Sequence, residues 1–284
     1  MRLAYNVDYP KGGIPVPAPP GTDPDEMEAL PVPTAAIPGV PDLMHNKYVI
    51  RDQATVWTGS TNWTADSWTR EENVIVIAES PALAARYGED FEQLWTKRDV
   101  RRSGKVDTSP VDVGGIQVRP WFCPGRGEQL AHRIAKAIGS AKRRVRIASP
   151  VLSSGPILGT LAQAASDGKI DIAGVVDRTQ IGEVLHQWRE NGNAEWKEPL
   201  LRTSLTRANF TGKRSTPYAP GSVHDYMHAK VTVADDVAFV GSFNLSHSGE
   251  LNAENVLEIA DAAIAEKLAA FVDEIRERYP PVTL

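Results

Sequence analysis

Cysteine, long apolar runs and a surplus of basic residues are what this 284-residue sequence lacks. Its single cysteine, Cys123, excludes an intrachain disulfide and a cysteine-based zinc site, and we expect it to be a buried small hydrophobic residue. The start, MRLAYNVDYP, lacks the apolar segment of a signal peptide, and no run approaches about 18 apolar residues. As encoded, the chain is therefore expected to be cytoplasmic, with no transmembrane segment.

The charge balance argues against a dedicated nucleic-acid binder. Thirty-one Lys and Arg stand against 36 Asp and Glu, which gives a net charge of −5. Nucleic-acid binders usually carry a basic surplus, because contacts to phosphates supply much of their affinity. Apolar residues make up 42% and charged residues 24%, which is typical of a globular protein. The length allows two domains of about 150 residues each.

The first part of the chain alternates strand-like runs with a proline-rich stretch. Residues 2–8 predict a short buried strand, and ten of the 21 prolines then fall between Pro10 and Pro41. Proline removes a backbone donor and fixes φ, so segment 10–41 is expected to hold neither helix nor central strand. It is interpreted as a semi-rigid polyproline II loop or, alternatively, as a wall facing the substrate. Further strands are predicted at 44–51, 54–58 and 73–78, followed by a helix to Trp95 that is capped by Ser80.

The second part predicts an α/β fold with a largely parallel sheet. Strands are expected at 116–122, 143–149, 169–177, 227–233, 237–240 and 255–260, and helices at 128–142, 155–167 and 261–278, with an irregular passage at about 193–225. The charged run between the two parts reads as a linker. The predicted division is a first lobe over 1–98, a linker over 99–114 and a second lobe over 115–284.

Two segments of the chain repeat the same pattern, which is His-x-Lys, four residues and Asp, then Gly-Ser-x-Asn, then Glu-Asn at the start of a strand. About 0.015 matches to the first part are expected by chance from the composition. The two copies are His45, Lys47, Asp52, Gly59, Ser60, Asn62, Glu72 and Asn73, and His228, Lys230, Asp235, Gly241, Ser242, Asn244, Glu254 and Asn255.

Strand geometry indicates what the repeat can do. A period of two puts His and Lys on one face of a strand, so each copy presents an imidazole beside an ammonium group. Asp52 and Asp235 fall at hairpin turns, where an Asx-type bond to the backbone is the favoured role. Glycine permits a close backbone approach, and the side chains that follow offer hydrogen bonds to an oxyanion, namely Ser60, Asn62, Ser242 and Asn244. This combination suits a phosphate group.

The duplication predicts a single site. If the halves pack about a pseudo-twofold axis, one histidine attacks a phosphorus atom and the other protonates the leaving oxygen. Lys47 and Lys230, with the two asparagines, would surround the non-bridging oxygens and stabilise the transition state without a metal.

These residues resemble the two HKD motifs of the phospholipase D superfamily. The resemblance implies two pseudo-twofold-related α-β-α sandwich lobes with mixed sheets, one active site at their interface and no cofactor. It also implies a covalent phosphohistidine intermediate, with His45 as nucleophile and His228 as general acid and then base. The family's glutamate that holds the second ring nitrogen of each histidine matches Glu72 and Glu254.

Other groups near the repeats compete with this hypothesis. The segment from His224 to His228 has the spacing of a helical zinc site but leads into a β-branched strand, so a metal site is disfavoured. His224 and His247 are interpreted as rim or surface residues. Trp63 and Trp68 are expected to pack locally, or else to form an apolar wall for a lipid or a base.

The residues leave the substrate class open. The acidic pI and the apolar loops favour a phospholipid or a small phosphodiester, and they are compatible with a peripheral membrane contact. A nuclease would need a basic track, for which only Lys97–Lys105 and Lys142–Arg146 qualify. A cardiolipin synthase-like transferase and an inactive binding module are also compatible with the sequence. No protein partner is inferred.

The repeat also predicts that the first lobe is incomplete. If Asp8 is the counterpart of Asp177, the second lobe has strand, helix, strand and helix before that point, over about residues 116–168, where the first lobe has nothing. We therefore expect Met1 to be an internal start, with about 50 further residues upstream.

Overall fold

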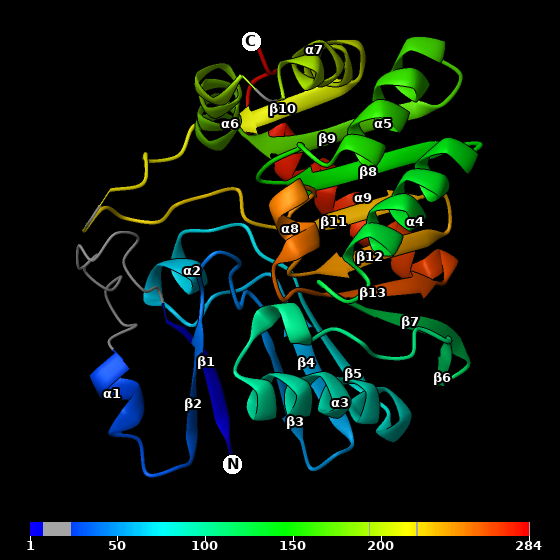
Figure 1. The fold of residues 1–284 in the computed structure, drawn as a ribbon. Helices are drawn as coiled ribbons and strands as arrows, with labels where there is room; N and C mark the ends of the chain where they lie inside the picture. The colour runs from blue at the N-terminus through cyan, green and yellow to red at the C-terminus, as the bar shows by residue number, and fades with distance from the viewer. Residues whose placement is uncertain (8–23, 193, 220, 284) are drawn as a thin grey trace.

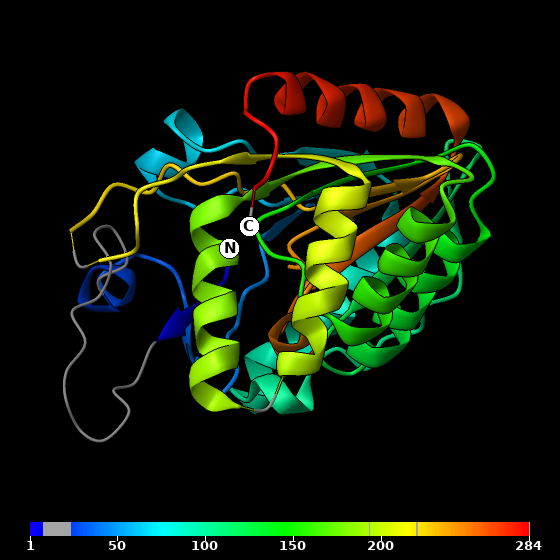
Figure 2. The same ribbon diagram turned by 90° about the horizontal axis from the view of Figure 1, so that it is seen from above.

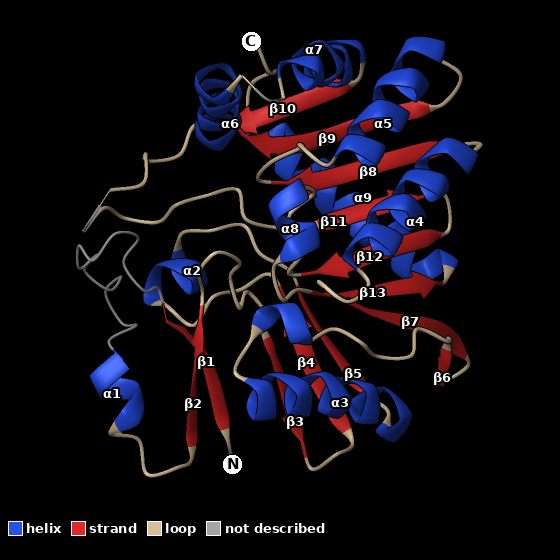
Figure 3. Cartoon of the chain, viewed as in Figure 1, coloured by secondary structure: helices blue, strands red, loops and turns tan. Residues whose placement is uncertain are grey.

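The second lobe is built on an eight-stranded mixed sheet with strand order β10-β9-β8-β11-β12-β13-β7-β6 (Figures 1 and 3). The computed structural model describes residues 1–7, 24–192, 194–219 and 221–283. The strands are β6 (Val111–Val113), β7 (Ile116–Phe122), β8 (Arg144–Ser149), β9 (Asp171–Asp177), β10 (Asn209–Lys213), β11 (Val231–Ala234), β12 (Val237–Gly241) and β13 (Asn255–Ala260).

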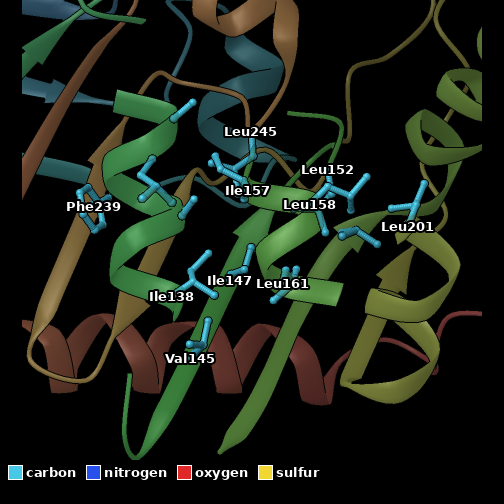
Figure 4. Packing of buried hydrophobic residues seen from close by; sticks show 14 of the residues in the cluster. Ile138, Val145, Ile147, Leu152, Ile157, Leu158, Leu161, Leu201, Phe239 and Leu245 are labelled. Carbon is cyan, nitrogen blue, oxygen red and sulfur yellow. The ribbon is translucent and has the colours of Figure 1, made fainter. Parts of the chain in front are cut away.

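Helices cover both faces of this sheet. Figure 2 shows α9 (Ala262–Glu277) on one face and α4 (Gly127–Ser140), α5 (Gly155–Asp167), α6 (Arg178–Asn191) and α7 (Glu198–Arg207) on the other. Under α4 and α5 lies a core of aliphatic and aromatic side chains that includes Ile138, Ile147, Leu161 and Phe239 (Figure 4). Burying one such side chain stabilises the fold by about 1.5–3 kcal/mol. The α-β-α sandwich expected for this lobe is confirmed.

The first lobe is smaller and its strands form two separate sheets. One contains β3 (Tyr48–Arg51), β4 (Thr55–Gly59) and β5 (Ile75–Glu79), and the other pairs β1 (Leu3–Val7) with β2 (Thr34–Pro38) in parallel. In the second lobe, β8 lies between β9 and β11. Among the described residues no strand takes that place in the first lobe, so β1 and β3 are not joined. The predicted counterpart Asp8 lies outside the described residues.

Helix α3 (Pro81–Lys97) covers one face of the three-stranded sheet. It begins as predicted, with the Ser80 hydroxyl accepting a hydrogen bond from the Leu83 amide at 3.2 Å and proline in the first turn. The other face of the sheet leaves three aliphatic side chains exposed, namely Val49, Ile75 and Ile77. The equivalent face of the second lobe is the one covered by α4.

The two lobes share one hydrophobic core. Side chains from α3 and β4, including Leu83, Tyr87 and Val56, pack in the same cluster as Met227 and Leu257 of the second lobe. The predicted linker also holds structure, because η2 (Val100–Arg102) and β6 lie within it and β6 pairs with β7. None of the helices in the described ranges is long and apolar enough to cross a membrane.

Three expectations about the fold need correction. The sheet is mixed but not largely parallel, since only β8, β9 and β10 pair in parallel; the two-residue turn between β11 and β12 imposes an antiparallel pairing. The passage 193–225 contains η3 (Glu195–Lys197), α7 and β10, because Leu201 and Leu205 form a buried stripe within a polar sequence. Part of segment 10–41 is regular as well, as α1 (Pro24–Glu28) and β2. In β2 a four-residue run without proline pairs with β1.

Candidate active site

The two His-x-Lys segments meet where the lobes join, and the backbone holds them in equivalent ways. The His45 amide donates to the carbonyl of Ala253 at 2.9 Å, and the His228 amide donates to the carbonyl of Glu72 at 3.1 Å. Each segment therefore hydrogen-bonds to a residue just before the last strand of the other lobe. This crossed pairing brings both histidines to one place, as the duplication predicts.

His45 forms a hydrogen bond with a carboxylate of the opposite lobe. Its Nδ1 lies 2.8 Å from both Oε1 and Oε2 of Glu254, whose side chain is fully buried. The carboxylate can only accept from this nitrogen, so Nδ1 carries the proton and Nε2 keeps its lone pair. The His45 side chain is 19% exposed and that of His228 9%.

His228 is held differently, and the expected role of Glu72 is wrong. The His228 Nδ1 lies 3.1 Å from Oδ1 of Asn73 and 3.4 Å from Oε2 of Glu71. Glu72 points elsewhere, to Lys213 Nζ at 2.8 Å and to the Tyr279 hydroxyl. The backbone carbonyl of Glu72 binds the His228 amide as that of Ala253 binds the His45 amide, so Glu72 corresponds to Ala253. The next residue, Asn73, is therefore the structural counterpart of Glu254.

The glycine of each Gly-Ser-x-Asn segment allows the close approach that was expected. A Cβ atom would lie 2.1 Å from the Val74 carbonyl oxygen at Gly59, and 2.1 Å from that of Asn255 at Gly241. These contacts dock β4 on β5 and β12 on β13 without room for any side chain.

The serines of these segments do not have the predicted phosphate-binding role. The Ser60 hydroxyl donates to Asn73 Oδ1 at 2.7 Å, and the Ser242 hydroxyl donates to Glu254 Oε2 at 2.6 Å. A hydroxyl has one proton to donate, so neither serine has a donor left for an oxyanion. They fix the groups that hold the histidines instead.

Lys47 and Lys230 provide the positive charge of the site. Both side chains are buried, and each ammonium donates to the carbonyl of the histidine two residues earlier, at 2.8 Å for Lys47 and 2.7 Å for Lys230. An ammonium group has three donors, so each lysine can also bind an anion lying between the motifs.

The remaining motif residues separate into structural groups and groups at the site. Asp52 and Asp235 both have φ near +50° and sit at turns as predicted. Asp235 does not make the expected Asx-type bond within its turn, because its carboxylate accepts from the amides of Lys142, Arg143 and Arg144 in another segment. Asp52 is exposed at the β3–β4 turn. Asn62 is half-buried, and Asn244 has a buried Oδ1 without a partner within the described part of the chain.

Burial and the lysines keep both imidazoles neutral. Burial lowers the pKa of His45, and the Lys47 and Lys230 ammonium groups lower it further, against the opposing effect of Glu254. Burial, both lysines and His45 together hold the pKa of His228 well below its usual range. At neutral pH each ring therefore has one free nitrogen lone pair, as a nucleophile or a base requires.

Anion binding at this site should weaken above pH 8. Burial lowers the pKa of Lys47 to about 8, so in the free protein its charged form dominates below that pH and is lost as the pH rises through it. Diethyl phosphate keeps a single charge over this range, and its Kd should rise up to about tenfold per pH unit above 8. Calorimetry at pH 7, 8, 9 and 10 measures this, and a constant Kd would contradict the role given to Lys47.

The competing features lie outside this cluster. Among the described residues no group of three or more His, Cys, Asp and Glu side chains is arranged to hold a metal ion. The His224 ring lies between Tyr218 and Tyr226, at centroid distances of 5.8 and 5.4 Å, and His247 is exposed beside Glu250. Cys123 is buried, as expected.

Trp63 and Trp68 form an exposed aromatic group beside the first motif. They are 60% and 54% exposed, and both rings contact Trp57, at centroid distances of 4.9 and 6.3 Å. Trp57 pairs with Val49 and Ile77 in the sheet, so the group lies on the exposed face of the three-stranded sheet, and Trp63 directly follows Asn62 in sequence.

The sequence analysis did not predict the residues that position the histidine and lysine segments. They are Glu71 and Asn73 beside His228, and the buried Asn255, which bonds to Asn46 at 3.1 Å, to Tyr87 at 3.2 Å and to Thr58. The sequence signal for this difference is one extra residue in the first copy. Val74, whose carbonyl accepts from the Ser60 amide, lies 14 positions after Ser60. Asn255, whose carbonyl accepts from the Ser242 amide, lies 13 positions after Ser242.

Comparisons with known proteins identify the family of the chain. The family model described as cardiolipin synthase, PLD-like domain, matches residues 24–95 and 134–276, more than half of the chain. Mitochondrial cardiolipin hydrolase of Xenopus laevis is 34% identical over 56 residues, which is 20% of this chain and 27% of that protein. The human protein of the same name is 33% identical over 55 residues, or 19% and 22%. The chain thus matches only about a quarter of their length.

A solved structure shows the same fold over both lobes. Phosphatidylserine synthase from Haemophilus influenzae Rd KW20 superposes with a TM-score of 0.63 at 14% identity, covering 91% of this chain and 68% of that one. At this identity the likeness concerns the fold alone. With the family match, the duplicated motifs and the two-lobed architecture, it follows that the chain belongs to the phospholipase D superfamily of phosphodiesterases.

Proposed function

We propose that the protein hydrolyses the head-group phosphodiester of a phospholipid through a phosphohistidine on His45, without a metal ion. The observation that carries this proposal is the cluster of two neutral imidazoles and two buried ammonium groups at the junction of the lobes. The cluster supplies a nucleophile, a proton carrier and positive charge within one site.

The reaction has two balanced steps. His45 Nε2 attacks phosphorus and forms a P–N bond, the bond from phosphorus to the head-group oxygen breaks, and His228 Nε2 gives that oxygen a proton. His228 then takes a proton from water, the water oxygen forms a P–O bond and the P–N bond breaks. His228 reaches its protonated form once the anionic substrate is bound, because the substrate's negative charge favours an imidazolium.

The lysines stabilise the charge that develops during both steps. Lys47 and Lys230 are fixed by bonds to the two histidine carbonyls, so they need no reorganisation as negative charge grows on the non-bridging oxygens. Two ammonium groups also repel a divalent cation from the same place. The positive charge that a metal would supply comes here from the chain itself.

Two features support a lipid rather than a nucleic acid. Three of the four basic side chains of Lys142–Arg146 form ion pairs, Arg143 with Asp236, Arg144 with Glu266 and Arg146 with Asp273. The run also lies at the end of β8 that is farther from the site. It begins this strand, whereas Val231, which directly follows Lys230 of the second motif, pairs with Ala148 near the end of β8. The chain instead exposes two tryptophans next in sequence to Asn62 of the first motif, and these suit contact with a lipid surface.

Side-by-side assays in EDTA test the proposal. Phosphatidylcholine vesicles, single-stranded DNA and bis(p-nitrophenyl) phosphate are offered to the same preparation, and release of choline, DNA fragments and nitrophenol is measured. Choline and nitrophenol should be released in EDTA, and DNA should stay intact.

A different activity would give different products. DNA cleavage without choline release would replace the lipid hydrolase by a nuclease of the same superfamily. Transfer of the phosphatidyl group to added glycerol in preference to water would indicate a transferase. Turnover that is lost in EDTA and restored by a divalent cation would contradict the mechanism.

A further inference from the structure

The two catalytic histidines are held by chemically different partners at equivalent positions. Glu254 and Asn73 each follow the residue whose carbonyl binds a histidine amide, and each receives a hydrogen bond from the serine of its own lobe, Ser242 or Ser60. The two lobes therefore have different groups at this equivalent position. The Glu254 carboxylate holds His45, and the Asn73 amide holds His228.

The orientation of the Asn73 amide follows from its surroundings. Its Nδ2 lies 3.0 Å from the Ser67 carbonyl oxygen and 3.1 Å from Glu71 Oε2, and both of these atoms only accept. Oδ1 must therefore face the Ser60 hydroxyl and the His228 ring. This makes Nδ1 of His228 the proton-bearing nitrogen and leaves Nε2 for proton transfer.

The Glu71 carboxylate lies next to the Asn73 amide and close to the His228 ring. Glu71 Oε2 lies 3.4 Å from His228 Nδ1, is held by the Ser67 hydroxyl at 2.6 Å, and its side chain is almost fully buried. His228 is otherwise faced by the cationic Lys230 and Lys47 and by His45. Glu71 is thus the anionic group beside His228, at a longer distance than Glu254 keeps from His45.

We propose that Asn73, together with Glu71, is the positioning residue of His228. The different partners of the two histidines then determine their roles. The Asn73 amide favours proton transfer by His228, and the Glu254 carboxylate favours nucleophilic attack by His45. A carboxylate on Nδ1 increases the electron density and basicity of Nε2, which favours attack on phosphorus. An amide fixes the ring equally well but leaves the protonated ring a stronger acid, which favours release of a proton. This inference rests on the proposed function.

Leaving groups of different basicity test the assignment. An alkoxide, such as that of choline, needs a proton as it departs, whereas nitrophenolate does not. In Asn73→Ala, the rate of choline release from phosphatidylcholine should fall about 10²-fold or more. The burst rate of nitrophenolate from bis(p-nitrophenyl) phosphate should fall less than about tenfold.

Glu254→Gln is the matched control, because it changes the equivalent position of the other repeat. It weakens the nucleophile, so it should slow the nitrophenolate burst and choline release by similar factors. The double variant Glu71→Gln with Asn73→Asp keeps one negative charge and moves it onto the acceptor of His228. It should hold the His228 ring but recover only a small part of the choline-releasing activity that Asn73→Ala loses, because a carboxylate on Nδ1 makes the protonated ring a weaker acid. Recovery of full activity would show that the amide does not assign proton transfer to His228.

Glu71→Gln alone adds a pH readout that a structural role would not move. Loss of the negative charge lowers the pKa of His228, so the alkaline limb for choline release should shift to lower pH by about half a unit to one unit. The inference would be overturned if Asn73→Ala lowered the release rates of choline and nitrophenolate by equal factors and Glu71→Gln left the alkaline limb of the pH–rate profile for choline release unshifted. Absence of both choline release and nitrophenolate release by the unmodified protein would instead overturn the proposed function.

Discussion

Replacement of either catalytic histidine, as His45→Ala or His228→Ala, should lower kcat for bis(p-nitrophenyl) phosphate by about 10⁴-fold or more, because His45 is needed to form the phosphohistidine and His228 to hydrolyse it. The effects should be of similar size because both rings serve one site, and they should not add in the double variant. Steady-state release of nitrophenol measures the loss. Circular dichroism should remain unchanged, since neither ring belongs to the shared hydrophobic core.

His132→Ala is the control for these variants. His132 lies on α4 with a side chain that is 63% exposed, so its replacement should leave turnover within about twofold. Full activity in either His45→Ala or His228→Ala would show that the lobes work separately and would contradict a shared site.

Lys47→Met and Lys230→Met should each lower kcat by about 10²- to 10³-fold, because each removes a fixed donor from the developing negative charge. Methionine keeps the length of the side chain and its apolar stem. Burial lowers the pKa of both lysines, which means that the fold holds these charges at a cost. Both variants should therefore unfold at an equal or higher temperature than the unmodified protein while losing activity.

Thermal unfolding and turnover should be measured on the same samples, with Lys136→Met as control. Lys136 is exposed on α4, and its replacement should change neither quantity appreciably. A large drop in melting temperature together with the loss of activity would mean that the buried lysines act mainly as structural groups.

Much of the fold could be predicted from local pattern. The strand at 255–260 and the helix at 155–167 have the predicted bounds, because apolar periodicity and flanking turn residues are strong signals there. Strand β2 was missed because prolines surround its short apolar run. Helix α7 was missed because its buried stripe is only a few residues wide.

The histidines and lysines of the candidate site could also be predicted from the sequence, but the side chains that position them could not. The motifs identify the histidines and lysines because strand period places each pair together. They cannot show that Glu254 holds a histidine of the opposite lobe, or that one extra residue after α2 (Ala65–Thr69) moves Glu72 out of position. That residue changes which side chain faces His228, and only the strand register reveals it.

Trapping the covalent intermediate tests the central claim most directly. His228→Ala lacks the base that activates water, but a nitrophenyl diester needs no proton to release its leaving group. After reaction with bis(p-nitrophenyl) phosphate, mass spectrometry of this variant should therefore find a nitrophenyl-phosphoryl adduct on His45, and the adduct should be absent from the His45→Ala/His228→Ala protein. An adduct on another residue, or none while nitrophenol is released in a burst, would contradict the phosphohistidine mechanism.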